Sequence, residues 1–103
     1  MIYFVYKLNP PRPTFAQDMT ESESKIMQEH AAYWQDLADK GIAIIFGPVL
    51  DPKGPWGLAI VEGNDESEVH TLGANDPAMK SGVGFKLEIY PMLRAVLRKS
   101  VSS

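Results

Sequence analysis

Two ionisable side chains in this 103-residue sequence, one histidine and one aspartate, stand out as a pair that could move protons. His30 lies on the apolar side of a helical pattern, and Asp76 lies in Asn75-Asp76-Pro77 after a second helical pattern. A carboxylate that accepts a hydrogen bond from one imidazole nitrogen fixes the tautomer and makes the other nitrogen a better base. The alternative is structural, with His30 as a satisfied core residue and Asp76 as a helix cap.

The predicted elements bring these two residues to one level. Both helices follow central strands that run parallel, and both start from the same edge of the predicted sheet. His30 stands about ten residues into its helix, which is roughly 15 Å at 1.5 Å per residue. The second helix is about ten residues long, so Asp76 at its end falls at the same depth. The two side chains are therefore expected at the same level, where a contact between them is possible.

Strand and helix patterns alternate along the chain. Segments rich in β-branched and aromatic residues predict strands at 2–8, 42–49, 56–62 and 83–90. Thr20-Glu21-Ser22-Glu23 fits a capping box, so a helix is expected from about residue 21 to Lys40, ended by Gly41. Asp65 and Glu68 fit the start of a second helix that ends at Asp76. The segment 92–99 predicts a short amphipathic C-terminal helix, and a tail follows.

A proline-rich segment separates the first strand from the first helix. Residues 9–19 hold three of the eight prolines, which remove amide donors and fix φ. We expect an extended loop here. Two interpretations stay open at this point, a plain connector and a flap that covers a site.

The order β-α-β-β-α-β predicts a ferredoxin-like α+β fold, in which a four-stranded antiparallel sheet carries two helices on one face. Strands 2–8 and 56–62 are apolar on both faces, as the two central positions require. The uncovered face is expected to present Tyr3, Val5, Ala59 and Val61. A patch this apolar favours contact with a partner over contact with water. The chain is therefore expected to be a single domain over 1–103 that forms a homodimer, sheet against sheet.

Four aromatic residues are candidates for substrate binding. Tyr3, Tyr6, Trp34 and Trp56 could line an aromatic cleft. The alternative is that they belong to the core and to the dimer interface. No metal site is predicted, because His30, His70 and Asp76 do not have the spacing of metal ligands and His70 falls on an outer helix face.

Composition narrows the classes of function further. The chain has no cysteine, which excludes a thiol nucleophile, a thiolate zinc site and an iron–sulfur cluster. A net charge of −3 argues against a nucleic-acid binder, and no apolar run is long enough to span a membrane. The N-terminus lacks the pattern of a signal peptide, so a cytoplasmic protein is expected. A core this thin also leaves little room for an enclosed pocket within one chain.

The sequence resembles the YciI-like (YCII-related) family of the dimeric α+β barrel superfamily. The resemblance covers residues 1–91 and leaves out 92–103. The matching segments are His30-Ala31-Ala32-Tyr33-Trp34-Gln35-Asp36-Leu37, Lys40-Gly41, Gly47-Pro48, Gly57, Asn75-Asp76-Pro77-Ala78 and Gly82. The resemblance implies a ferredoxin-like dimer with a His–Asp site at His30 and Asp76. One branch of the family includes a dehydrochlorinase that acts on a chlorinated hydroxyhydroquinone, which implies acid/base chemistry on small rings.

The leading interpretation is a small enzyme that needs no cofactor. His30 would act as general acid and base, oriented by Asp76, on a small organic substrate, aromatic or cyclic, bound in a cleft of the homodimer. The alternative is a module of the same fold that binds or senses a small ligand without catalysis. A third hypothesis is an accessory domain in which the two residues only satisfy each other.

Overall fold

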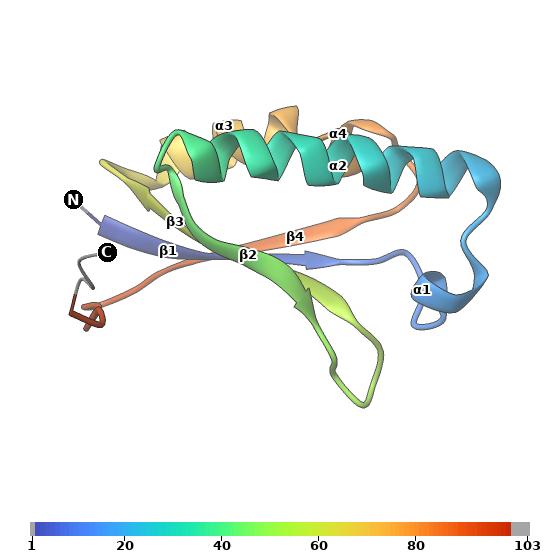
Figure 1. The fold of residues 1–103 in the computed structure, drawn as a ribbon, viewed down its shortest axis with the longest axis horizontal. Helices are drawn as coiled ribbons and strands as arrows, with labels where there is room; N and C mark the ends of the chain where they lie inside the picture. Colours follow the sequence, from blue (N-terminus) through green and yellow to red (C-terminus); the bar gives the residue numbers. More distant parts are fainter. Residues whose placement is uncertain (1, 100–103) are drawn as a thin grey trace.

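The computed structural model describes residues 2–99 and shows four strands and four helices within them (Figure 1). The strands are β1 (Ile2–Asn9), β2 (Ala43–Val49), β3 (Trp56–Gly63) and β4 (Lys86–Pro91). The helices are α1 (Phe15–Asp18), α2 (Glu21–Asp39), α3 (Glu66–Asn75) and α4 (Pro77–Lys80). Two of these helices, α1 and α4, are single turns that the sequence patterns did not predict.

The strands form one antiparallel sheet in the order β2-β3-β1-β4. β1 and β3 are therefore the central strands, and the predicted ferredoxin-like α+β fold is confirmed. The helices α2, α3 and α4 lie together on one face of the sheet (Figure 1). Within residues 2–99 the opposite face carries no helix, so the core lies between the sheet and this single helical layer.

The register of β1 and β3 decides which residues enter the core. Phe4 pairs with Val61 and Tyr6 with Ala59, and residues that pair directly point to the same face. All four are buried under the helices. The expectation that Ala59 and Val61 lie on the uncovered face is therefore wrong. Small residues are needed here because Tyr6 and the Trp34 indole, whose ring centroids are 4.6 Å apart, fill the space above the sheet.

The uncovered face is formed by the alternate residues of β1 and β3, whose side chains point away from the helices. Tyr3 and Val5 lie there as expected, and their partners across the sheet are Glu62 and Ile60. Tyr90 of β4, 50% exposed, pairs with Val5, and Ile45 of β2, 58% exposed, pairs with Ile60. This face therefore stays apolar, with different residues of β3 from those predicted.

Helix α2 begins and ends as the sequence predicts. The amide of Glu23 donates to the Thr20 hydroxyl at 3.1 Å, and the Thr20 amide donates to the Glu23 carboxylate at 2.9 Å, which completes the capping box. Gly41 follows the helix with φ of +79°, a conformation that costs glycine little. The buried side of the helix carries His30, Trp34 and Leu37, so the cap and the end fix where His30 stands.

Residues 9–19 form more than an extended loop. The helical turn α1 lies within this segment, and Phe15 is 4% exposed because its ring packs edge-on against Phe85 at a centroid distance of 5.1 Å. The segment is therefore attached to the core by an aromatic side chain.

The chain after β4 departs from prediction. Residues 92–99 form no helix, and β4 begins at Lys86 rather than at residue 83. A helix of eight residues is marginal unless its apolar side packs, and here Leu93 and Val96 are 97% and 93% exposed. The amide of Met92 instead donates to the Tyr3 carbonyl at 2.8 Å, which continues the pairing with β1. None of the helices within residues 2–99 combines the length and the apolar character that crossing a bilayer requires.

The capping box gives a first prediction. Thr20→Ala removes the acceptor of the Glu23 amide, and we expect a loss of about 1 kcal/mol in the free energy of unfolding. Thr20→Ser keeps the hydroxyl, so its free energy of unfolding should be close to that of the parent. Urea titration of the three proteins measures both differences. Equal stability of Thr20→Ala and the parent would show that the cap does not hold this end of α2.

Candidate active site

Asp76 stands at the junction of α3 and α4, where the local sequence dictates a break. It ends α3 and caps α4 with an extended ψ of 125°, because the residue before a proline avoids the helical region. Pro77 then occupies the first turn of α4, and the amide of Ala78 donates to Asp76 Oδ1 at 2.9 Å. The Asp76 side chain is fully buried. A cap of this kind holds the carboxylate at a fixed place under α2.

The predicted meeting of the two ionisable residues is present in the structure. His30 Nδ1 lies 2.7 Å from Asp76 Oδ1, and both side chains are buried. Asp76 Oδ2 accepts two further hydrogen bonds, from the Tyr6 hydroxyl and from Trp34 Nε1, both at 2.8 Å. The carboxylate therefore has partners on both oxygens, and none of the buried side-chain polar atoms within residues 2–99 lacks one.

The surroundings keep Asp76 ionised. Burial raises the pKa of the Asp76 carboxyl. The hydrogen bond and attraction of His30, with the hydrogen bonds from Trp34 and the Ala78 amide, outweigh burial, so this pKa lies below its ordinary value. An ionised carboxylate only accepts hydrogen bonds, so His30 must carry a proton on Nδ1. Nε2 of the same ring is then left free to take up or give a proton.

Tyr6 and Trp34 occupy different places from those expected of substrate-binding residues. Both are almost fully buried, and neither lines the pocket described below. Burial, followed by the nearby Asp76 carboxylate, raises the pKa of the Tyr6 hydroxyl, so this hydroxyl stays a donor to Asp76. Their contacts with Asp76 were missed because Tyr6 is 70 residues away from it and Trp34 is 42. The one signal in the sequence for these contacts is that the Tyr6 hydroxyl and the Trp34 indole NH, both hydrogen-bond donors, fall on positions predicted to face the core.

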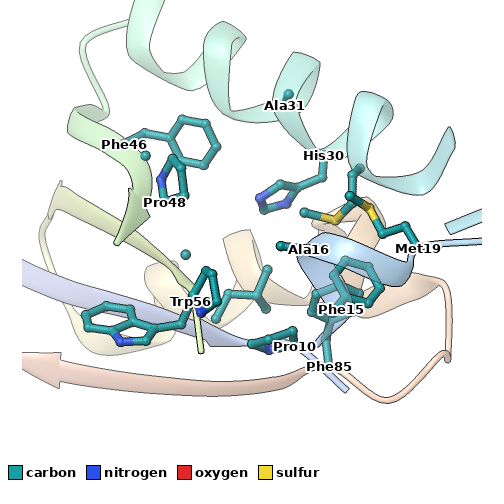
Figure 2. A pocket seen from close by; sticks show the side chains of 15 residues that line it. Pro10, Phe15, Ala16, Met19, His30, Ala31, Phe46, Pro48, Trp56 and Phe85 are labelled. Atoms are coloured by element: carbon teal, nitrogen blue, oxygen red, sulfur yellow. The ribbon is translucent and has the colours of Figure 1, made fainter. Parts of the chain in front are cut away.

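A pocket of about 330 Å³ opens beside His30 (Figure 2). Most of its lining is apolar and comes from distant segments: Phe15, Met19, Met27, Phe46, Trp56 and Phe85 are among its residues. His30 is the one residue of this lining with an ionisable side chain. Figure 2 shows its imidazole directed into the cavity, with Phe46 and Pro48 on one side and Phe15 and Ala16 on the other. A volume of this size fits a small organic molecule.

Of the remaining candidates, one lines this pocket and two lie away from it. Trp56 lines it, as a substrate-binding residue would, while Tyr3 lies on the uncovered face of the sheet. His70 is exposed on α3, where its Nε2 lies 3.3 Å from the Glu66 carboxylate. Among the described residues there is no group of three histidine or acidic side chains placed to hold a metal ion.

The arrangement is suited to proton transfer. Asp76 fixes the tautomer and orientation of His30 and stabilises the imidazolium that forms when Nε2 takes a proton. The apolar lining lowers the local polarity beside His30, and electrostatic interactions are stronger there than in bulk water. A bound molecule with an acidic hydrogen near Nε2 would therefore meet an oriented base.

Comparison with known proteins agrees with this fold. A solved structure of 5-chloro-2-hydroxyhydroquinone dehydrochlorinase (TftG) from Burkholderia phenoliruptrix AC1100, in complex with 2,5-dihydroxybenzoquinone, superposes with a TM-score of 0.61. The two chains are 23% identical over 86% of this chain and 90% of that one, a likeness that establishes the fold. No curated protein matches the sequence. The YCII-related domain matches residues 1–93, and the chain therefore belongs to the YCII-related domain family.

Proposed function

We propose that this protein is an acid/base enzyme in which His30 Nε2 exchanges a proton with a small organic substrate. The observation that carries the proposal is the 2.7 Å contact between His30 Nδ1 and the buried Asp76 carboxylate, at the wall of a pocket. The substrate donates a proton to Nε2, and the conjugate base stays in the pocket until the imidazolium returns the proton or gives it to a leaving group. Proton transfer of this kind requires no cofactor.

The lining restricts the substrate to a small, largely apolar molecule. Among residues 2–99, no ionisable side chain other than that of His30 lines the pocket, so a carboxylate or phosphate on the substrate would lose its hydration without gaining a cationic partner. Phe15, Phe46 and Trp56 favour a flat ring. The named ligand of the dehydrochlorinase with the same fold, 2,5-dihydroxybenzoquinone, is a ring of this kind. We therefore propose an aromatic or cyclic substrate with an acidic hydrogen.

The second candidate is a module that binds or senses a small ligand without turning it over. The apolar lining with one polar group supports binding as well as it supports catalysis. In that case His30 would only orient the ligand by a hydrogen bond from or to Nε2. The two candidates differ in whether a bound ligand is chemically changed.

We also propose that the protein works as a homodimer in the cytoplasm, with the dimer built on the uncovered face of the sheet. Val5, Ile45, Ile60 and Tyr90 form a continuous apolar strip across all four strands of this face. Burying such a strip contributes roughly 25 cal/mol per Å², which matters to a chain with a thin core. A second copy offers the same strip, and two sheets pack well face to face.

Replacement of the two ionisable residues tests the enzymatic proposal. We expect His30→Gln to lower kcat/KM by about 10²- to 10⁴-fold, because it removes the proton carrier. Asp76→Asn should lower kcat by a similar factor, because an amide no longer holds the required tautomer. The assay follows a panel of halogenated hydroquinones and small phenols by absorbance and halide release, with exposed His70→Ala as the matched control.

The outcomes of this assay separate the candidates. Turnover that survives His30→Gln would overturn the assignment of His30. If the parent protein binds 2,5-dihydroxybenzoquinone in calorimetry but converts no member of the panel, the binding module is favoured. If both variants unfold at ordinary temperature, as judged by circular dichroism, the pair is structural.

The dimer is tested by one charge on the uncovered face. Ile60→Asp places a carboxylate in the centre of the apolar strip, where burial against a second copy is unfavourable. Light scattering should give twice 11.4 kDa for the parent and 11.4 kDa for Ile60→Asp. Ala32→Asp, on the exposed side of α2, should leave the mass at the parent's value. A parent of 11.4 kDa at micromolar concentration would contradict the proposal.

A further inference from the structure

Residues 10–19, hereafter the strap, form one wall of the pocket beside His30. Pro10, Phe15, Ala16 and Met19 of this segment line the cavity. Figure 2 shows Phe15, Ala16 and Met19 on the side of the imidazole opposite to Phe46. Without the strap, this side of the pocket would open to water, so the size of the pocket depends on where the strap lies.

The strap is docked against two loops through glycines. A Cβ on Gly54, in the turn between β2 and β3, would lie 3.0 Å from the Pro13 carbonyl oxygen, and φ of Gly54 is +128°. A Cβ on Gly84, before β4, would lie 3.3 Å from Pro11 Cβ. These contacts bring the backbones close together but form no hydrogen bonds. They position the strap without anchoring it to the helical layer.

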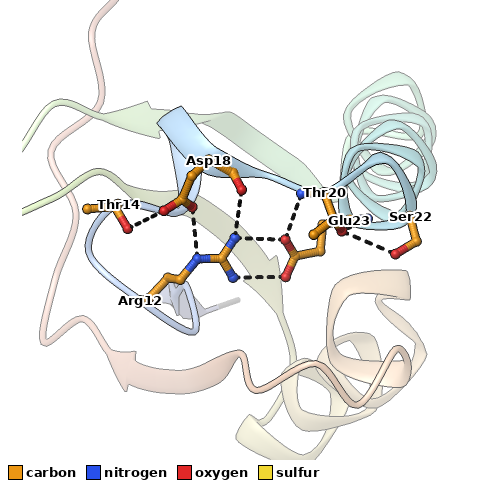
Figure 3. A network of polar contacts seen from close by, with 6 residues as sticks. All are labelled: Arg12, Thr14, Asp18, Thr20, Ser22 and Glu23. Atoms are coloured by element: carbon orange, nitrogen blue, oxygen red, sulfur yellow. Dashed lines mark hydrogen bonds and ion pairs between the residues drawn. The ribbon is translucent and has the colours of Figure 1, made fainter.

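One arginine supplies the polar anchor (Figure 3). Arg12 Nη1 and Nη2 donate to the two carboxylate oxygens of Glu23 at 2.9 and 2.8 Å. Arg12 Nε donates to Asp18 Oδ1 at 2.8 Å, and Nη2 also donates to the Asp18 carbonyl at 3.0 Å. Arg12 therefore joins both ends of the strap to the first turn of α2, the helix that carries His30.

The Arg12–Glu23 pair has the geometry of a strong contact. It is bidentate, and the Glu23 side chain is only 11% exposed, so water screens it less than an ordinary surface pair. The hydrogen bonds from Arg12, followed by that from the Thr20 amide, lower the pKa of Glu23 to about 2. The carboxylate thus serves two purposes, since it caps α2 and it holds the strap.

We infer that Arg12 is a positioning residue that holds the strap closed over His30 and thereby sets the access to the pocket and the size of ligand it accepts. Arg12 itself does not line the pocket and acts through Phe15, Ala16 and Met19. The single turn α1 is too short to persist by itself, so loss of the anchor leaves the wall held only by apolar contacts, chiefly that of Phe15 with Phe85, and loosens it. The part of this inference that concerns ligand size rests on the proposed function, whereas the part that concerns access to His30 does not.

The chain contains two histidines, which provide an internal reference for a test of access. His30 is 5% exposed beside the strap, and His70 is exposed on α3. Diethyl pyrocarbonate modifies accessible neutral imidazoles, and peptide mass spectrometry gives the two rates separately. We expect Arg12→Ala to raise the ratio of the His30 rate to the His70 rate by about tenfold, as loss of a charged hydrogen-bonded contact predicts.

Two further variants make the test specific. Glu23→Gln keeps the capping box, because glutamine at this position also accepts from the Thr20 amide, but it removes the negative charge that Arg12 binds. It should give an intermediate rise in the ratio with an unchanged helix signal in circular dichroism. Asp36→Ala breaks the exposed pair with Lys40 on the same helix and should leave the ratio at the parent value. If Arg12→Ala fails to fold, the ratio measured in Glu23→Gln decides whether the Arg12–Glu23 pair limits access to His30.

Binding of phenol and of the longer 4-phenylphenol tests ligand size. The parent should bind phenol and exclude 4-phenylphenol. Arg12→Ala should bind phenol more weakly and should also bind 4-phenylphenol. A general loss of stability would not produce this gain of binding. If the parent binds neither phenol, the proposed substrate class fails while the histidine ratio still tests the strap. An unchanged ratio in both Arg12→Ala and Glu23→Gln would overturn the inference, as would unchanged size preference in a parent that binds phenol.

Discussion

The structure depends on one buried carboxylate that must be satisfied. Asp76 has no exposure to water, and a buried charge without partners would cost far more than the marginal stability of a domain of this size. Its donors come from three separate elements: Tyr6 of β1, His30 and Trp34 of α2, and the amide of Ala78 in α4. Satisfying this carboxylate therefore fixes α2 and α4 against the centre of the sheet.

The structural and the chemical interpretations of the pair describe the same contact. A core histidine satisfied by a carboxylate and a general base oriented by one have an identical bond between Nδ1 and Oδ1. The two interpretations differ at Nε2, where a general base needs contact with a bound molecule, and His30 lines a cavity that could hold one. The hydrogen bonds from Tyr6 and Trp34 satisfy the second carboxylate oxygen and fix the place of Asp76, as both interpretations require.

The sequence allowed prediction wherever a local rule applied. The cap at Thr20, the end of α2 before Gly41 and the equal depth of the ionisable pair all follow from helix geometry. The faces of β3 could not be predicted, because both of its faces are apolar and only pairing with β1 chooses between them. The helix expected at 92–99 failed for a related reason, since an amphipathic pattern forms a helix only where a surface receives its apolar side.

A thin core explains why the pocket wall is built from a connecting segment. One sheet and one helical layer leave little interior, and Asp76 with its donors fills the region beneath His30. A cavity beside His30 therefore has to be closed from outside, and the proline-rich strap does this with Phe15 inserted into the core. Its prolines reduce the entropy lost on ordering, and Arg12 attaches it to the helix that carries His30. Glu23, which binds Arg12, and His30, which contacts Asp76, thus stand about two turns apart on the same helix.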